Sequence, residues 1–221
     1  MPWAGDPDLA ELARLVEVMA TLRARCPWDA SQTHRSLVPY LVEEALEVVE
    51  AIEVGDRADL LEELGDLLFQ VVFHAEIAGE SADGFGLGAV AAGVADKLVA
   101  RHPHVFAPDP TVAGGSPAEV LAALDRGWEE RKAVEKGRRS VLEGIPDQLS
   151  ALAKATKIIA RSRARSVPVA LPDAPVTAGE LGEQVLDLVA RAQASGIDAE
   201  QAVRDAVREL EDRVRRAESG G

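Results

Sequence analysis

This chain of 221 residues contains a single cysteine and a single tyrosine, and aromatic side chains make up only 4% of it. With Cys26 alone, no disulfide can form within the chain, which favours a reducing compartment. No run approaches the roughly twenty apolar residues of a membrane-spanning helix. The N-terminus also lacks a basic segment followed by an apolar one. We therefore expect a cytoplasmic protein that does not bind membranes.

Positive charge is also scarce. The chain has 24 Lys and Arg against 38 Asp and Glu, a net charge of −14. Such an acidic protein is poorly suited to binding a nucleic-acid polymer, whose phosphates attract basic patches. It would repel a nucleotide as well, unless a metal ion and a local basic patch intervene. The length is sufficient to bury a core, as one large or two small domains.

The acidic residues concentrate between residues 41 and 79, where eleven carboxylates accompany one Arg. Apolar residues recur with helical periodicity here and along the whole chain, and no alternating strand stands out, so we predict an all-α fold. On a helical wheel, residues 60–75 are apolar around most of the circumference. We expect so apolar a helix to be buried, with its acidic stripe facing an interior site. That stripe consists of Asp59, Glu63, Asp66, Gln70 and His74.

Buried carboxylates without Lys or Arg beside them repel one another and take up protons unless a cation joins them. Glu63 and Asp66 on this segment, with Glu43, Glu44 and Glu47 on the preceding one, offer the oxygen ligands that Mg²⁺ or Mn²⁺ prefers. The alternative is a solvated helix face, which normally interleaves Lys and Arg. A di-iron carboxylate site is excluded, because no histidine follows a Glu by three residues. The pattern favours a divalent-metal site.

Helix signals divide the chain further. Gly55 is typical of a helix end, and Asp56 is a typical N-cap for the next helix. Pro27 ends the first helix, and Pro103 breaks the fourth. We expect a loop over residues 26–36 and a flexible linker over 107–117. The expected helices are residues 8–25, 37–54, 56–79, one ending before Pro103, and a charged, peripheral helix over 117–136.

Several motifs occur in a fixed order. They are CPWD (26–29), QTH (32–34), YLVEEALE (40–47), ELGDLLFQVVFHA (63–75), KLVARHPHVF (97–106), Trp128 with Lys132, and SVLEGIP (140–146). In this combination the chain closely resembles the MazG family of all-α nucleoside triphosphate pyrophosphohydrolases. The resemblance covers roughly residues 8–160. It implies a dimeric helical bundle, a homodimer in which helices of two chains pack together.

The resemblance further implies Mg²⁺- or Mn²⁺-dependent hydrolysis of nucleoside triphosphates to monophosphate and pyrophosphate, as nucleotide-pool housecleaning. Glu44, Glu47, Glu63 and Asp66 match the family's metal-binding and catalytic positions. On the wheel, Glu43 shares the centre of the polar face with Glu47, so it remains an outer-shell or general-base candidate. The nearest alternatives are a pyrimidine-specific all-α dUTP or dCTP pyrophosphatase and a phosphoribosyl-ATP pyrophosphohydrolase. An alternative of another class is a non-enzymatic helical interaction module.

Three further residues are candidates for substrate binding. Lys97 and Arg101 share a helix face and can hold the outgoing phosphates, although they can also be ordinary surface cations. Trp28 can stack on a base or anchor a dimer from an exposed loop. His102 and His104, on either side of Pro103, are phosphate donors or metal ligands, or simply packed against the turn.

The C-terminal part repeats the second acidic helix. Residues 180–196 (ELGEQVLDLVARAQASG) align with residues 63–79, with Glu183 in place of Asp66. The first acidic helix has no counterpart, because residues 166–177 are proline-rich and lack glutamate. We therefore predict a MazG-like catalytic domain over 1–110, a linker with a peripheral helix over 111–146, and a truncated second MazG-like domain with a structural role over 147–221.

Overall fold

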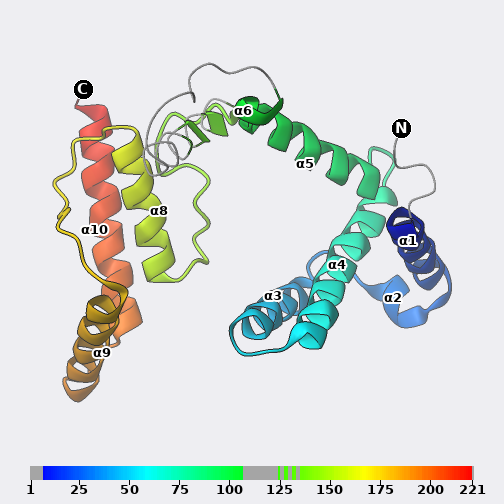
Figure 1. Cartoon of the computed structure of the whole chain (residues 1–221), viewed down its shortest axis with the longest axis horizontal. Helices are drawn as coiled ribbons and strands as arrows, with labels where there is room; N and C mark the ends of the chain where they lie inside the picture. The colour runs from blue at the N-terminus through cyan, green and yellow to red at the C-terminus, as the bar shows by residue number, and fades with distance from the viewer. Residues whose placement is uncertain (1–6, 107–123, 125–126, 129–130, 133–134, 221) are drawn as a thin grey trace. The chain divides into compact units, whose positions relative to one another are not determined.

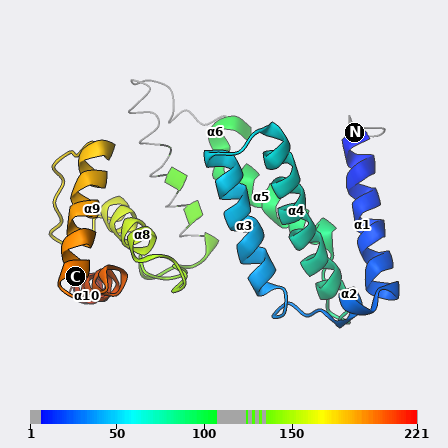
Figure 2. The same cartoon turned by 90° about the horizontal axis from the view of Figure 1, so that it is seen from below.

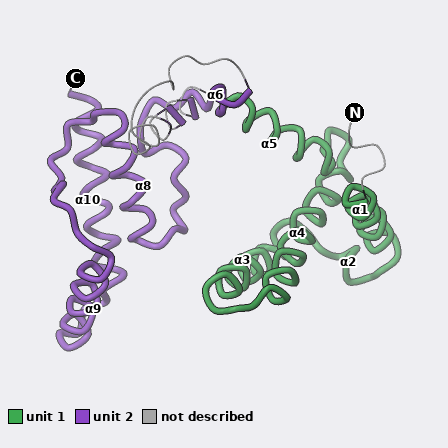
Figure 3. The backbone as a smooth tube through the Cα atoms, in the orientation of Figure 1, with its two compact units in different colours: residues 1–100 green, residues 101–221 purple. Residues whose placement is uncertain are grey.

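The computed structural model describes residues 7–106, 124, 127–128, 131–132 and 135–220. Every regular element in these ranges is a helix, so the predicted all-α class is confirmed. The chain forms two compact units, residues 1–100 and 101–221 (Figure 3). No helix in the described part of the chain is long and apolar enough to cross a membrane. The predicted linker over 107–117 and most of the charged helix over 117–136 lie outside the described residues.

The first unit is built on a pair of adjacent helices. They are α3 (Val38–Glu53) and α4 (Arg57–Gly79), joined by a short turn (Figures 1 and 2). Asp56 caps α4 by accepting from the backbone N–H groups of Ala58 and Asp59, while the Asp59 carboxylate accepts from the Asp56 N–H, a capping box. Gly55 is required because a Cβ there would come within 2.8 Å of the Ala51 backbone. The predicted helix boundary at residues 55–56 is therefore confirmed.

Further helices of this unit surround the pair: α1 (Pro7–Arg25) packs against α4, and the short α2 (Pro27–Ser31) packs against α1. The helix α5 (Leu87–Arg101) follows α4. The core lies between α1 and the second half of α4, where Met19, Val72 and Phe73 are at most 1% exposed. We expected residues 26–36 to form a loop throughout. That expectation is wrong for 27–31, because Pro27 has the φ that starts a helix and begins a single turn of one.

The expectation that this helix is largely buried holds only for the second half of α4 in the chain by itself. Its buried residues all lie at or after Gln70, where α1 covers it. In the first half, Leu61 is 75% exposed and Leu64 49%. Leu46 and Ile52 on α3 are equally uncovered, at 63% and 66%. The first half of α4 and the outer side of α3 thus present apolar side chains to solvent.

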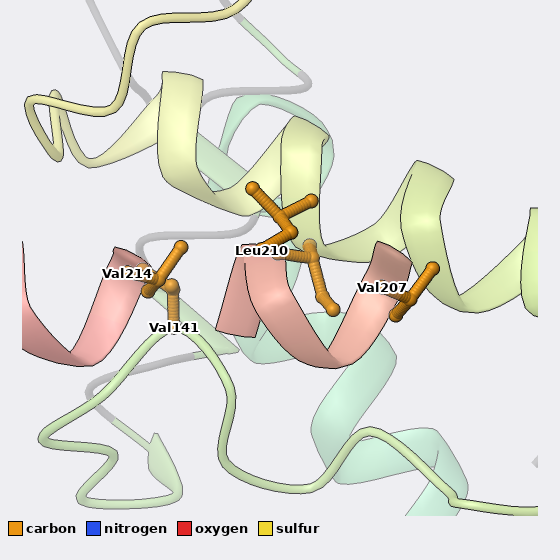
Figure 4. Packing of buried hydrophobic residues seen from close by; sticks show 5 residues of the cluster. Val141, Val207, Leu210 and Val214 are labelled. Atoms are coloured by element: carbon orange, nitrogen blue, oxygen red, sulfur yellow. The ribbon is translucent and has the colours of Figure 1, made fainter. Parts of the chain in front are cut away.

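The second unit contains α6 (Pro103–Phe106), α8 (Ala151–Ala164), α9 (Ala178–Ala194) and α10 (Ala199–Ser219). Its core joins α8, α10 and the segment before α8 through Val141, Ile158, Val207, Leu210 and Val214 (Figure 4). By contrast, α9 contributes no buried residue. Residues 166–177, between α8 and α9, contain no helix.

Candidate metal centre and substrate site

The acidic residues of α3 and α4 face one another in antiparallel register. The charge of Asp66 helps to raise the pKa of Glu44, and the charge of Glu47 helps to raise the pKa of Glu63, so these residues lie close across the two helices. Residues three or four apart on a helix lie on one face, so Glu44 with Glu47 and Glu63 with Asp66 form two facing pairs. The two predicted acidic stripes therefore meet in the groove between the helices.

Three carboxylates converge at the centre of this arrangement. One oxygen from each of Glu44, Glu63 and Asp66 lies within 4.8 Å of the others. Glu44 and Glu63 are partly buried, whereas Asp66 is exposed. None of the three forms an ion pair with a Lys or Arg in the described part of the chain. The geometry is that of an open, oxygen-only site reached from solvent.

The protonation of these groups reflects their crowding. Burial, followed by the charges of Asp66 and Glu47, raises the pKa of Glu44. Burial and then Glu47 raise the pKa of Glu63 in the same way. Like charges held together in a partly desolvated site disfavour ionisation, and a divalent cation removes this repulsion. The donor set therefore fits Mg²⁺ or Mn²⁺, which take carboxylate oxygens.

Glu47 lies beside the three-residue group rather than within it. Its negative charge helps to raise the pKa of Glu44, and it lines a pocket of about 320 Å³ at the turn between α3 and α4. Glu63, Glu50 and Asp59 line the same pocket, so the acidic surface extends beyond the predicted four ligands. Glu43 is exposed, and its charge raises the pKa of Glu44 less than the charges of Asp66 and Glu47 do.

Trp28 lies on α2 and is 50% exposed. Its ring meets Tyr40 of α3 edge to face, with centroids 6.2 Å apart. Arg23 fixes the segment that carries it, because its guanidinium donates to the backbone carbonyls of Asp29 and Gln32. An exposed aromatic pair thus stands at the start of the helix that carries Glu44 and Glu47.

Lys97 and Arg101 lie on α5. Lys97 is partly buried. Arg101 is 6% exposed, donates to the Glu135 carboxylate at 2.7 and 2.9 Å, and lies over the Trp128 ring at 5.1 Å. The structure therefore gives Arg101 an acidic and an aromatic partner of its own. The ring of His102 also contacts Trp128, and the Nδ1 of His104 is buried without a hydrogen-bond partner.

A pair of histidines lies further along the same stripe of α4. His74 Nδ1 and His34 Nδ1 are 2.8 Å apart, and the ring planes are parallel within 3°. Stacked rings would keep all their atoms further apart than the 2.8 Å between the two nitrogens. The two rings therefore meet edge to edge through Nδ1 and not face to face. Burial and then His34 lower the pKa of His74. The stripe indicated Gln70 and His74, but no sequence signal indicated His34 as a partner.

The fold and the site together define an all-α protein with an acidic centre, suited to a divalent cation, between two antiparallel helices. Residues 32–106 match the model of the MazG nucleotide pyrophosphohydrolase domain, which spans both acidic helices. The chain belongs to the MazG family.

Named relatives agree with this assignment. The chain is 45% identical over 221 residues to a 26.1 kDa protein in the blaB 3′ region of Streptomyces cacaoi, covering 99% of this chain and 87% of that protein. It is 45% identical over 154 residues to the nucleoside triphosphate pyrophosphohydrolase of Escherichia coli K12, covering 67% of this chain and 56% of the relative. The protein of that name in Mycobacterium tuberculosis is 36% identical over 219 residues, 96% of this chain and 60% of its own length. The chain thus spans little more than half of these two pyrophosphohydrolases.

Proposed function

We propose that this chain hydrolyses nucleoside triphosphates to nucleoside monophosphate and pyrophosphate, with Mg²⁺ or Mn²⁺, as cytoplasmic housecleaning of nucleotide pools. The observation that carries the proposal is the convergence of Glu44, Glu63 and Asp66 within 4.8 Å. All three lie inside the segment matched by the family model. The names of the E. coli and M. tuberculosis relatives support the same reaction.

Glu44, Glu47, Glu63 and Asp66 would hold the cation, Glu47 from beside the three carboxylates that converge. When bound, the cation neutralises phosphate charge and polarises the α-phosphate. The carboxylates fix its place in the groove between α3 and α4, so the triphosphate is drawn to an otherwise repellent acidic surface. Loss of one ligand would weaken both charge neutralisation and orientation.

The chemical step is a displacement at the α-phosphorus. The oxygen of water forms a bond to phosphorus while the bond from phosphorus to the bridging oxygen breaks, and pyrophosphate leaves with the electron pair. The proton of the attacking water passes to a carboxylate. Glu43, which is exposed and lies outside the three-residue group, is the candidate for this base.

Substrate contacts are proposed at three positions. Trp28, exposed beside Tyr40, offers a face on which a base can stack. Lys97 and Arg101 are proposed to hold the outgoing phosphates. Arg101 now pairs with the Glu135 carboxylate. To bind substrate, its guanidinium would release this carboxylate and pair with a phosphate, which is also an anion.

We further propose that the active form is a homodimer. The outer side of α3 and the first half of α4 expose Val42, Leu46, Ile52, Leu61 and Leu64 by 49–75%. Contiguous apolar side chains of this kind mark interaction sites. A second copy of the chain would bury them and close the open side of the acidic centre.

The C-terminal repeat is proposed to be a truncated MazG-like domain, within 147–221, that has no metal site. Glu180 is already engaged, because its carboxylate accepts from the backbone N–H and the hydroxyl of Thr177 in a capping box. These hydrogen bonds lower the pKa of Glu180. Glu180 is therefore a poor metal ligand, because its carboxylate already binds its own helix N-terminus. The repeat also has no second acidic helix to supply the remaining oxygens.

A substrate panel with pyrophosphate detection tests the activity. Canonical and modified ribo- and deoxynucleotides are incubated with Mg²⁺, with Mn²⁺, and with chelator. We expect pyrophosphate only where the cation is present. Turnover confined to dUTP or dCTP would favour the pyrimidine-specific alternative, and no turnover of any triphosphate would favour a helical interaction module.

A further inference from the structure

The stripe that carries Asp66 continues along α4 through Gln70 and His74. These residues are four apart, so each lies one helical turn from the next on the same face. Gln70 is only 3% exposed, yet its Oε1 has no hydrogen-bond partner among the described residues. The Nε2 of His74 is also buried, and the described part of the chain offers it no partner. Two incomplete polar groups thus lie one helical turn apart on the stripe that carries a predicted metal ligand.

A purely structural role does not account for Gln70. A buried amide oxygen without a donor costs free energy, because it has given up water and gained nothing. Leucine would occupy similar space in this otherwise apolar helix without that cost. A buried polar residue that lacks a partner is commonly explained by a functional role. The neighbouring groups indicate what that role is.

The contact between His34 and His74 determines which ring nitrogen of His74 carries its proton. A neutral imidazole carries one N–H, so one Nδ1 of the pair donates and the other accepts. If His34 donates to His74, the proton of His74 lies on Nε2. That nitrogen then becomes a buried donor one turn from Gln70, whose bare Oε1 is a buried acceptor. In the opposite tautomer, both buried atoms would be acceptors and neither could satisfy the other.

We propose that Gln70 is the positioning residue for Asp66, held in place by a chain of hydrogen bonds from His34 through His74. His34 donates to His74, His74 donates through Nε2 to Gln70 Oε1, and the Gln70 amide group donates to the Asp66 carboxylate. The structure contains the contact between His34 and His74 at 2.8 Å. The other two bonds are part of the proposal, and the four-residue spacing on one helix face places their groups one turn apart. Hydrogen bonds from such outer partners hold ligating carboxylates in orientation. The inference rests on the metal site of the proposed function.

The experiment measures Mn²⁺ binding to the full chain by titration with paramagnetic resonance detection of the free ion. Changing Gln70→Leu should weaken Mn²⁺ binding by about 10- to 100-fold, the range for removing an outer partner. The metal-free unfolding temperature should not fall, because leucine removes the bare polar atom. Gln184→Leu, the same change at an exposed position of α9, is the matched control and should bind Mn²⁺ like the wild type.

The histidine arm supplies a second measurement. His74→Phe should weaken Mn²⁺ binding in the wild-type background but have little further effect when combined with Gln70→Leu, because both act through one chain. Gln70→Met gives the same comparison if the leucine variant does not fold. Wild-type affinity in the Gln70 variants, or additive losses in the double variant, would overturn the inference and leave the proposed function intact. A wild-type chain that binds no Mn²⁺ would overturn both.

Discussion

At the scale of single residues, the role of each acid depends on its neighbours. Asp56 and Glu180 are acids whose carboxylates cap helices, and each accepts hydrogen bonds from its own turn. Glu44 and Glu63 have acids as neighbours instead, and the pKa of each is raised. The first arrangement satisfies a carboxylate within the chain. The second leaves it in need of a cation.

The substitution Asp66→Asn tests whether the neighbouring acids of α3 and α4 need a cation. It keeps the shape of the side chain but removes a charge from the three-residue group, so kcat/KM should fall by about a hundredfold or more, beyond the range for outer partners. Steady-state kinetics at saturating Mn²⁺ measures it. Asp83→Asn, the same change at an exposed position after α4, is the control. Equal activity of both variants would contradict the assignment of Asp66.

At the scale of elements, Arg23 ties α1 to the end of α4. Its guanidinium donates to the Glu80 carboxylate at 2.7 and 2.8 Å and to the α2 segment. The hydrogen bond from Arg23 lowers the pKa of Glu80 below its ordinary 4.5. A lowered carboxyl pKa contributes stability that is present above the ordinary value and is lost as pH falls through the folded value.

Glu80→Gln should therefore destabilise the chain near pH 7 by at most about 1 kcal/mol, because Glu80 is half exposed and solvent screens the pair. The difference from wild type should shrink as the pH falls below 4.5 and vanish once the pH lies below the lowered pKa of Glu80. Urea unfolding followed by circular dichroism from pH 3 to 8 measures it. Glu17→Gln on α1 serves as the control, and a difference as large at pH 3 as at pH 7 would contradict the ion pair.

The repeated helix gives a second prediction for elements. Glu180→Gln and Glu183→Gln should leave turnover within a few-fold, whereas Glu63→Gln should nearly abolish it. The reason is that α9 has no acidic helix opposite, so it cannot assemble the oxygens that a divalent ion requires. Pyrophosphate release under identical conditions compares them. Loss of activity in the α9 variants with survival of Glu63→Gln would place the active site in the other half of the chain.

Local features were predictable from the sequence, and long-range contacts were not. The start of α4 at Asp56 and the turn at Gly55 depend on a few adjacent residues, so their pattern sufficed. Periodicity placed Glu43 and Glu47 at the centre of the acidic stripe of α3, and only the family resemblance indicated Glu44, whose pKa is raised by Asp66. The partner of His34 and the uncovered first half of α4 depend on where distant segments pack, which periodicity does not encode. The helical turn of α2 is hard to predict because a proline can both end the preceding helix and begin the next, and Pro27 does both.

At the scale of the whole molecule, α3 and the first half of α4 leave apolar side chains exposed to solvent. Leu61→Glu should convert a homodimer to monomers, because it places a charge in the proposed interface. In a monomer, the same change at a residue 75% exposed would be nearly neutral. Light scattering at micromolar concentration distinguishes the two. A wild-type chain that is already monomeric would contradict the dimer.

The central claim is that the acidic groove between α3 and α4 directs water to the α-phosphorus of a nucleoside triphosphate. The most direct measurement is phosphorus NMR of the reaction products. The wild-type chain reacts in the presence of Mn²⁺ or Mg²⁺, and the cation is removed before the spectrum is recorded. The account predicts nucleoside monophosphate and pyrophosphate in equal amounts, and neither product from Asp66→Asn. Nucleoside diphosphate with orthophosphate would contradict it.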